Sequence, residues 1–255
     1  MLQPHSLLWH YLWVAPCVFL AVLALVMWKR GLHREFPAFF CYTVFEAVGG
    51  GTIYAMDVSP SVVSDRIFWW SYLSFLIVEV FIKLVVVGEV FTHLLRRYPP
   101  LGRLARVLIS GVGVVLVFTG TIIAAYASPT PFWLISATRI LGRSASVVQC
   151  GLILFLFVFA AHFHLRWGRC VFGITLGFGI VSSAYLAHWA LMADWLFGQK
   201  SILLDFVTMA TYQVCVLIWC YYLLVPQKSA TTSAVLLPEN NLDIWNRELE
   251  RLLQQ

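Results

Sequence analysis

Charged residues are scarce in this chain of 255 residues. Asp, Glu, Lys and Arg together make up 11% of the sequence, whereas 61% of it is hydrophobic. Soluble domains carry about a quarter charged residues, because a water-facing surface needs them. The shortage of charge therefore excludes an ordinary soluble domain and predicts an integral membrane protein.

Catalytic and metal-binding patterns are also lacking. The six cysteines lie in or at the edges of apolar segments without metal-ligand spacing, so we interpret them as small buried apolar residues and not as disulfide partners. His93, His162 and His164 have no metalloenzyme spacing either, which makes a metal or haem site the less favoured interpretation. We therefore predict no cofactor and no metal. We also predict no nucleic-acid partner, because the net charge of +5 comes from short loops between apolar runs.

Long apolar stretches are what the sequence has in place of charge. Seven of them reach the roughly 20 residues that an α-helix needs to cross a bilayer. They are Leu7–Trp28, Phe36–Met56, Ile67–Leu95, Leu104–Ala127, Leu134–Leu165, Cys170–Phe197 and Ile202–Val225. We predict an all-α polytopic membrane protein, with a seven-transmembrane-helix bundle over residues 1–225. Gly173, Gly177 and Gly179 in the sixth run predict close contact between helices.

Basic residues are distributed unevenly between the two sets of loops. One set holds only Arg66 and Lys200. The other holds Lys29, Arg30, Arg34, Arg96, Arg97, Arg103, Arg106, Arg166, Arg169 and Lys228. Because cytoplasmic loops carry an excess of Lys and Arg, we predict an external N-terminus and a cytoplasmic C-terminus.

Ionisable residues interrupt the third apolar run. Tyr72, Glu79 and Lys83 lie on one face of a helix, because steps of seven and four residues return close to the same angle. Ionisable groups are costly in hydrocarbon and mark either a structural pair or a site. The Glu79–Lys83 couple fits both interpretations: a neutral pair that lets the helix insert, or a ligand or proton site. We interpret Glu89 and His93, a second i,i+4 couple further along, as structural.

Two arginines in the fifth run, Arg139 and Arg143, are also spaced i,i+4. Since like charges cannot neutralise each other, they need acidic partners or an anionic ligand. The other runs offer acids in the membrane, and together these groups predict a polar cavity walled by the second, third, fifth, sixth and seventh runs and open to the outer side. Its predicted ligand-binding residues are Glu46, Tyr72, Glu79, Lys83, Arg139, Arg143, His188, Asp194, Asp205 and Tyr212.

The composition changes after Pro226. Residues 226–238 are small and polar, as in a linker. Within residues 239–255 an apolar stripe predicts a short amphipathic helix on the cytoplasmic side, formed by Leu242, Trp245, Leu249 and Leu252. Such a helix either lies on the membrane or on the loops of the bundle, or it docks a cytoplasmic protein partner.

Three classes of function remain. A sensor-like or binding module would take a small anionic or amphiphilic ligand from the outer side. A small-solute or proton-coupled transporter is the alternative, favoured by Glu46, Glu79 and Lys83, and an intramembrane enzyme comes third because no nucleophile and base stand at a recognisable spacing. The seven-run layout resembles rhodopsins and G-protein-coupled receptors in topology, but the seventh run has no lysine for a retinal Schiff base, so we assign no family.

Overall fold

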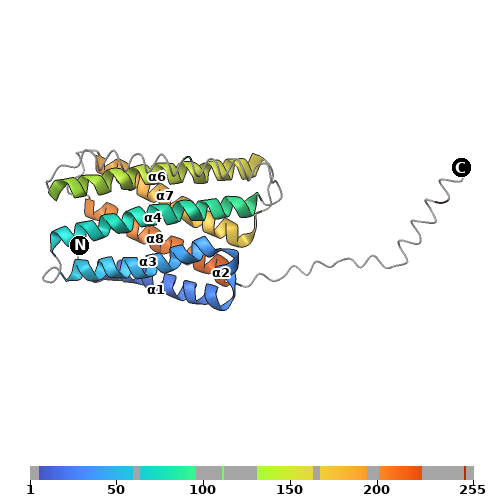
Figure 1. The fold of residues 1–255 in the computed structure, drawn as a ribbon, viewed down its shortest axis with the longest axis horizontal. Coiled ribbons are helices and arrows are strands. Elements are labelled where there is room, and N and C mark those ends of the chain that lie inside the picture. Colours follow the sequence, from blue (N-terminus) through green and yellow to red (C-terminus); the bar gives the residue numbers. More distant parts are fainter. Residues whose placement is uncertain are drawn as a thin grey trace. The chain divides into compact units, whose positions relative to one another are not determined.

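The computed structural model describes residues 6–59, 64–95, 111, 131–162, 167–193, 201–225 and 250. Every element within these ranges is an α-helix. In chain order they are α1 (Leu7–Lys29), α2 (Leu32–Glu35), α3 (Pro37–Val58), α4 (Asp65–Leu94), α6 (Pro131–His162), α7 (Arg169–Ala193) and α8 (Ser201–Leu224). The bundle is shown in Figure 1.

Each predicted apolar run except the fourth corresponds to one long helix. The fourth run, Leu104–Ala127, lies outside the described residues apart from the helical Gly111, so the seven-span count stays a prediction. Within the described part of the chain, four stretches are long and apolar enough to cross a membrane, which supports the membrane-protein class: Leu7–Lys29, Ile140–His162, Arg169–His188 and Ile202–Leu224. The predicted linker and amphipathic tail helix also lie outside the described residues, except for Glu250, which is helical.

Local sequence explains where the first helices begin and end. The Ser6 hydroxyl caps α1 by accepting a hydrogen bond from the backbone N–H of Trp9 at 3.4 Å. Gly31 follows α1 with φ of 73°, a left-handed conformation that suits glycine. The four-residue helix α2 comes next, and Pro37 occupies the first turn of α3, where its missing N–H costs nothing.

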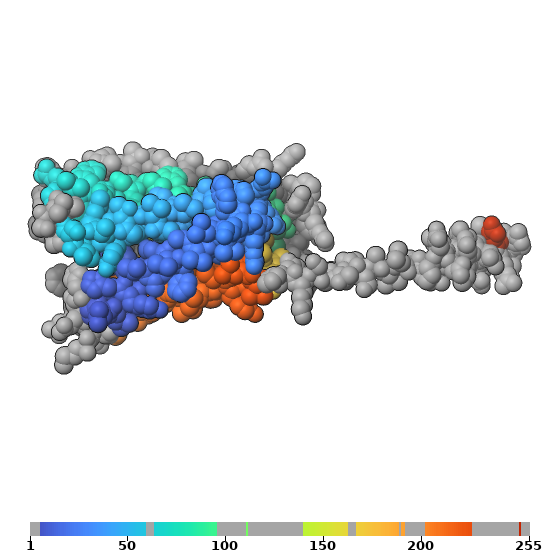
Figure 2. Space-filling view, turned by 90° about the horizontal axis from the view of Figure 1, so that it is seen from below, coloured from blue at the N-terminus to red at the C-terminus, as the bar shows by residue number. Residues whose placement is uncertain are grey.

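The long helices form a closed ring. Going round it, α1 contacts α3, α3 contacts α4, α4 contacts α6, α6 contacts α7, α7 contacts α8, and α8 returns to α1. Figure 2 shows α1, in dark blue, between α3 and the orange α8. We call the two ends of this bundle the Ser6 end, where α1 begins, and the Lys29 end, where α1 ends.

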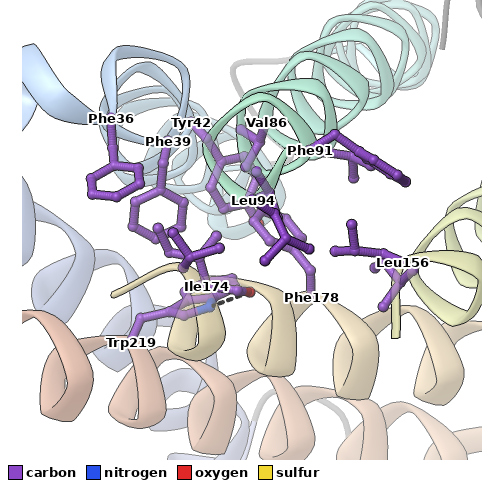
Figure 3. Close-up of a cluster of buried hydrophobic side chains, with 14 of the residues drawn as sticks. Phe36, Phe39, Tyr42, Val86, Phe91, Leu94, Leu156, Ile174, Phe178 and Trp219 are labelled. Carbon is purple, nitrogen blue, oxygen red and sulfur yellow. Dashed lines mark hydrogen bonds between the residues drawn. The ribbon is translucent and has the colours of Figure 1, made fainter. Parts of the chain in front are cut away.

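An aromatic cluster fills the bundle toward the Lys29 end. Phe39 and Tyr42 from α3, Phe178 from α7 and Trp219 from α8 are fully buried and pack in edge-to-face and tilted arrangements (Figure 3). The indole N–H of Trp219 donates to the backbone carbonyl of Ile174 at 3.3 Å, so its polar atom is satisfied.

Glycines permit this packing. A Cβ atom at Gly177 would collide with the Trp219 ring, and one at Gly173 would collide with Tyr222. A Cβ at Gly179 would lie 3.3 Å from the Ile153 side chain on α6. The predicted close helix contact along the sixth run is therefore confirmed, and α7 uses it against both of its neighbours in the ring.

Charged side chains at the Lys29 end bind helix termini. The Glu89 carboxylate of α4 accepts hydrogen bonds from the backbone N–H groups of Ala38 and Phe39 at 3.0 Å each, where α3 begins. Arg30 donates to the carbonyls of Leu223 and Leu224 at 3.3 and 2.6 Å, where α8 ends. Each charge faces the helix terminus of opposite partial charge, so both bind groups that the helix itself leaves unpaired.

His93 has a separate structural role beside Glu89. Its Nδ1 lies 3.0 Å from the backbone carbonyl oxygen of Glu89, and its ring stacks on Phe36 with centroids 4.7 Å apart. The Glu89 carboxylate bonds to α3, so these two residues do not form a side-chain ion pair. The structure agrees with the structural interpretation of both residues and supplies the contacts that explain it.

Candidate ligand-binding cavity

A cavity of about 530 Å³ lies between α1, α3, α4, α7 and α8. Seven of the twenty described residues that line it are aromatic: Trp9, Trp13, Trp69, Tyr72, Phe75, Tyr185 and Tyr212. Polar groups enter the same space from the side chains of Cys17, Glu46, Glu79, His188, Asp205 and Thr208. A volume of this size, mainly apolar with a few converging polar groups, is typical of small-molecule sites.

The helices that line the cavity differ from the predicted set in one respect. The fifth run, α6, was expected in the wall, but no described residue of α6 lines the cavity, and α1 contributes Trp9, Trp13 and Cys17 instead. The ring order explains the exchange. Because α4 and α7 contact each other directly, α6 lies behind them, whereas α1 lies between α3 and α8.

Most of the predicted site residues come together in this cavity. Glu46, Tyr72, Glu79, His188, Asp205 and Tyr212 all line it. Lys83 is buried next to Glu79, one helical turn further along α4. The structure thus brings together residues from four helices that are far apart in the sequence.

The two predicted arginines of the fifth run are not among the described residues that line the cavity. Arg143 is exposed on α6, does not line the cavity, and forms no ion pair with any acid among the described residues. The side chain of Arg139 and the whole of Asp194 lie outside the described part of the chain. Two arginines in the cavity wall were the reason to expect an anionic ligand, and the described geometry gives that expectation no support.

Three charged groups meet at the deep end of the cavity. Glu79 and Lys83 form an i,i+4 ion pair with side-chain exposures of 14% and 10%. The Lys83 ammonium also lies over the ring of Tyr185, 5.5 Å from its centroid. Glu46 approaches from α3, interacts electrostatically with both Glu79 and Lys83, and is only 9% exposed.

Glu46 has side-chain hydrogen bonds with Glu79 and Tyr212, but one of its two oxygens is left without a partner in the described part of the chain. Its Oε1 atom is buried and has no hydrogen-bond donor among the described residues. Buried polar atoms in proteins are nearly always hydrogen-bonded, so each exception needs an explanation. Because the Glu46 side chain lines the cavity, its carboxyl is a candidate partner for a bound ligand.

A second polar cluster lies closer to the Ser6 end. His188 on α7 lies 3.8 Å from Asp205 through Nε2 and 3.3 Å from the Thr208 hydroxyl through Nδ1. The Thr208 hydroxyl donates its proton to the backbone carbonyl of Leu204 at 2.8 Å. This group resembles a nucleophile, base and acid in composition only, because the hydroxyl proton is directed at its own helix and not at the histidine. Asp205 is 35% exposed and therefore partly solvated.

Sequence reasoning predicted Tyr72 and Tyr212 but missed the other aromatic residues of the cavity wall. Trp9 and Trp13 on α1 pack edge to face at 5.8 Å, and Trp9 meets Phe206 of α8 at 5.6 Å. His10 on the same turn lies 2.9 Å from the Tyr54 hydroxyl. The i,i+4 spacing of Trp9 and Trp13 was a visible signal, but tryptophans near the end of a span also occur where a helix faces lipid at the membrane interface.

The charge of the cavity is predominantly negative. Its carboxylates are Glu46, Glu79 and Asp205, and the adjacent fixed cation is Lys83. His188 adds positive charge only when it is protonated. Aromatic faces attract cations, so the rings and the acids favour the same kind of ligand. Among the described residues, no group of three His, Cys, Asp or Glu side chains could hold a metal ion.

Comparisons with known proteins give no match: no family model fits the chain, and no curated protein or solved structure is significantly similar to it. The functional argument therefore depends on the cavity, its charges and its walls.

Proposed function

We propose that this protein is a sensor-like membrane binding protein whose cavity takes a small cationic amphiphile, an organic ammonium ion with an aromatic or aliphatic part. The observation that carries the proposal is the pairing of aromatic wall residues with two buried carboxyl groups, Glu46 and Glu79, that share the single ammonium of Lys83. The ammonium group would bind the deep carboxylates, and the apolar part would lie among the rings of α1, α4 and α7.

Charge complementarity favours a cation over an anion. An anion in the same position would lie beside Glu46 and Glu79 with Lys83 as its adjacent fixed counter-ion, and Lys83 is already paired. Displacing that pair would leave Glu79 buried without a partner, which is costly. The expected anionic ligand is thus replaced by a cationic one, while the amphiphilic character is retained.

The packed half of the bundle favours binding over transport. The buried cluster around Trp219 closes the space between the helices on the Lys29 side of the cavity. With the orientation that the loop charges predict, the cavity opens to the outer side and the tail lies in the cytoplasm. A signal would then pass to a partner at Leu242, Trp245, Leu249 and Leu252. A reporter fused after Gln255 should be cytoplasmic and one in the Asp57–Arg66 loop external.

Matched ligands test the proposal. Phenethyltrimethylammonium, phenylpropionate and phenylpropanol share an aromatic group and differ in charge. Added to the purified full chain in detergent, they can be followed by the fluorescence of the cavity tryptophans. We expect saturable binding of the ammonium compound and at least tenfold weaker binding of the other two. Tighter binding of the carboxylate would overturn the cationic assignment.

Two cysteines provide an independent measure of occupancy. Cys17 lines the cavity, whereas Cys41 is exposed on α3. The ammonium ligand should slow maleimide labelling of Cys17 in a Cys41→Ser background and leave the labelling of Cys41 unchanged in a Cys17→Ser background. Ligand uptake into proteoliposomes that contain the protein would instead favour the transporter.

A further inference from the structure

The Glu46 carboxyl is the one deep charge that its surroundings do not balance. Lys83 lies within ion-pair distance of Glu79 and also faces the Tyr185 ring, so the ammonium already has its partners. Glu46 interacts with this pair electrostatically and has side-chain hydrogen bonds with Glu79 and Tyr212, while its Oε1 atom has no donor among the described residues. The side chain is nine-tenths buried and faces the cavity.

A buried carboxylate in this position needs a positive partner. Removing a carboxylate from water without a counter-charge is strongly unfavourable, and the nearby Glu79 carboxylate adds repulsion. A pair of carboxylates that share one site commonly retains a proton on one of them. Because Lys83 already pairs with Glu79, the further positive partner that Glu46 needs before a cation binds is a proton.

We propose that Glu46 exchanges this proton for the cationic group of the ligand. The protonated carboxyl releases H⁺ to solvent, and the resulting carboxylate forms an ion pair with the incoming ammonium, so one positive charge replaces another. This inference rests on the proposed function, because it describes how the same cavity takes a cationic ligand. It adds a consequence of its own: each ligand bound releases one proton, so binding tightens as the pH rises.

The other groups around Glu46 are poorer sources of the proton. They are Glu79 and Lys83 on α4, Tyr42 on α3, Tyr212 on α8, Tyr185 on α7 and Cys17 on α1. Glu79 is already paired with Lys83, and the phenols and the thiol are uncharged near neutral pH. Asp205 is partly solvated and lies beside His188, which gives it a partner other than a proton.

The pH dependence of binding tests the exchange. Phenethyltrimethylammonium is a suitable probe, because a quaternary ammonium carries the same charge at every pH. Its dissociation constant can be measured on the full chain in detergent from pH 6 to 8.5. Calorimetry in two buffers with different ionisation enthalpies then counts the protons released. We expect one proton per ligand and about a tenfold gain in affinity per pH unit while Glu46 keeps its proton.

Two variants identify the residue that releases the proton. Glu46→Gln should bind weakly with no pH dependence and release no proton, since the amide cannot ionise. Glu89→Gln is the matched control, because Glu89 is engaged with the start of α3 outside the cavity, and it should retain the wild-type slope. If Asp205→Asn abolishes the slope while Glu46→Gln retains it, the proton comes from Asp205 and the inference is wrong.

The outcomes for the inference and for the proposed function can be told apart. Tight binding by the wild type without pH dependence or proton release would overturn the exchange and leave a cation-binding cavity. Absence of binding at every pH would remove both. If Glu46→Gln does not fold, the proton count on the wild type still decides between exchange and simple binding.

Discussion

The two halves of the helical bundle use charge in opposite ways. Toward the Lys29 end, Glu89 and Arg30 bind backbone groups at the ends of α3 and α8, and the interior between them is filled by Phe39, Phe178 and Trp219. Toward the Ser6 end, charged side chains from several helices face a cavity of about 530 Å³. Glu89 and Arg30 in the packed half therefore have backbone partners, whereas in the cavity half one oxygen of Glu46 has no donor among the described residues.

The hydrogen-bond partners of a charged residue distinguish a structural role from a functional one more clearly than its burial does. Glu46 and Glu89 both lie within long apolar helices. Glu89 has two backbone donors, whereas one oxygen of Glu46 has none among the described residues. The distinction lies in what surrounds each carboxyl, and it can be tested by making the same kind of change in each half.

Removing the ammonium from the cavity half should have the largest effect on stability. Lys83→Met leaves Glu79 buried without its partner, so we expect a loss of about 3–5 kcal/mol in the free energy of unfolding at pH 7.5. The double variant Glu79→Gln/Lys83→Met, which removes both charges, should lie within about 1 kcal/mol of the wild type. Thermal unfolding in detergent measures both. A double variant as unstable as the single one would show that the pair itself is essential.

The glycines provide a direct comparison between the halves. Gly177→Ala places a methyl group against the Trp219 ring in the packed half, and we expect a loss of about 1–3 kcal/mol from overpacking. Gly51→Ala makes the same change on α3, where nothing lies within 4 Å of the added Cβ. That variant should be unchanged or up to about 1 kcal/mol more stable, because alanine favours helix. Equal effects on the unfolding temperature would contradict the contrast in packing.

The two glutamates should give the smallest and most selective effect. Glu89→Gln weakens two charge-assisted hydrogen bonds at the start of α3, so we expect a loss of about 1–2 kcal/mol with ligand binding unchanged. Glu46→Gln should change stability by less than about 0.5 kcal/mol, because the amide is as neutral as the protonated carboxyl that we propose and can still hydrogen-bond to Glu79 and Tyr212. Unfolding in detergent and ligand titration on the same samples provide the comparison. A large loss of stability in Glu46→Gln would assign Glu46 a structural role.

Much of the bundle was predictable because the bilayer restricts what an apolar chain can do. Backbone groups in hydrocarbon must pair within the segment, so long apolar runs become helices. The boundaries agree within a few residues: Ile67–Leu95 was predicted and α4 spans Asp65–Leu94. The short helix α2 was missed, because four residues in a polar loop carry no periodic signal.

The candidate site was predictable only through its charges. Glu46, Glu79 and Asp205 stand out in apolar runs, and all three line the cavity. Trp9 and Tyr185 give no such signal, because an aromatic residue in a span can face lipid, a neighbouring helix or a cavity with the same spacing. Arg143 stood out as clearly as the acids did, yet it is exposed on α6.

The sequence by itself determined the membrane class, the long helices and the identity of the ionisable residues within them, because each follows from composition and from spacing along one segment. The tertiary structure alone decided which of those residues meet. The order of helices around the ring brings α1 to the cavity wall and leaves α6 behind α4 and α7. That order depends on contacts between segments far apart in the chain, such as Gly177 against Trp219 and Glu89 against the start of α3, and no single segment encodes them.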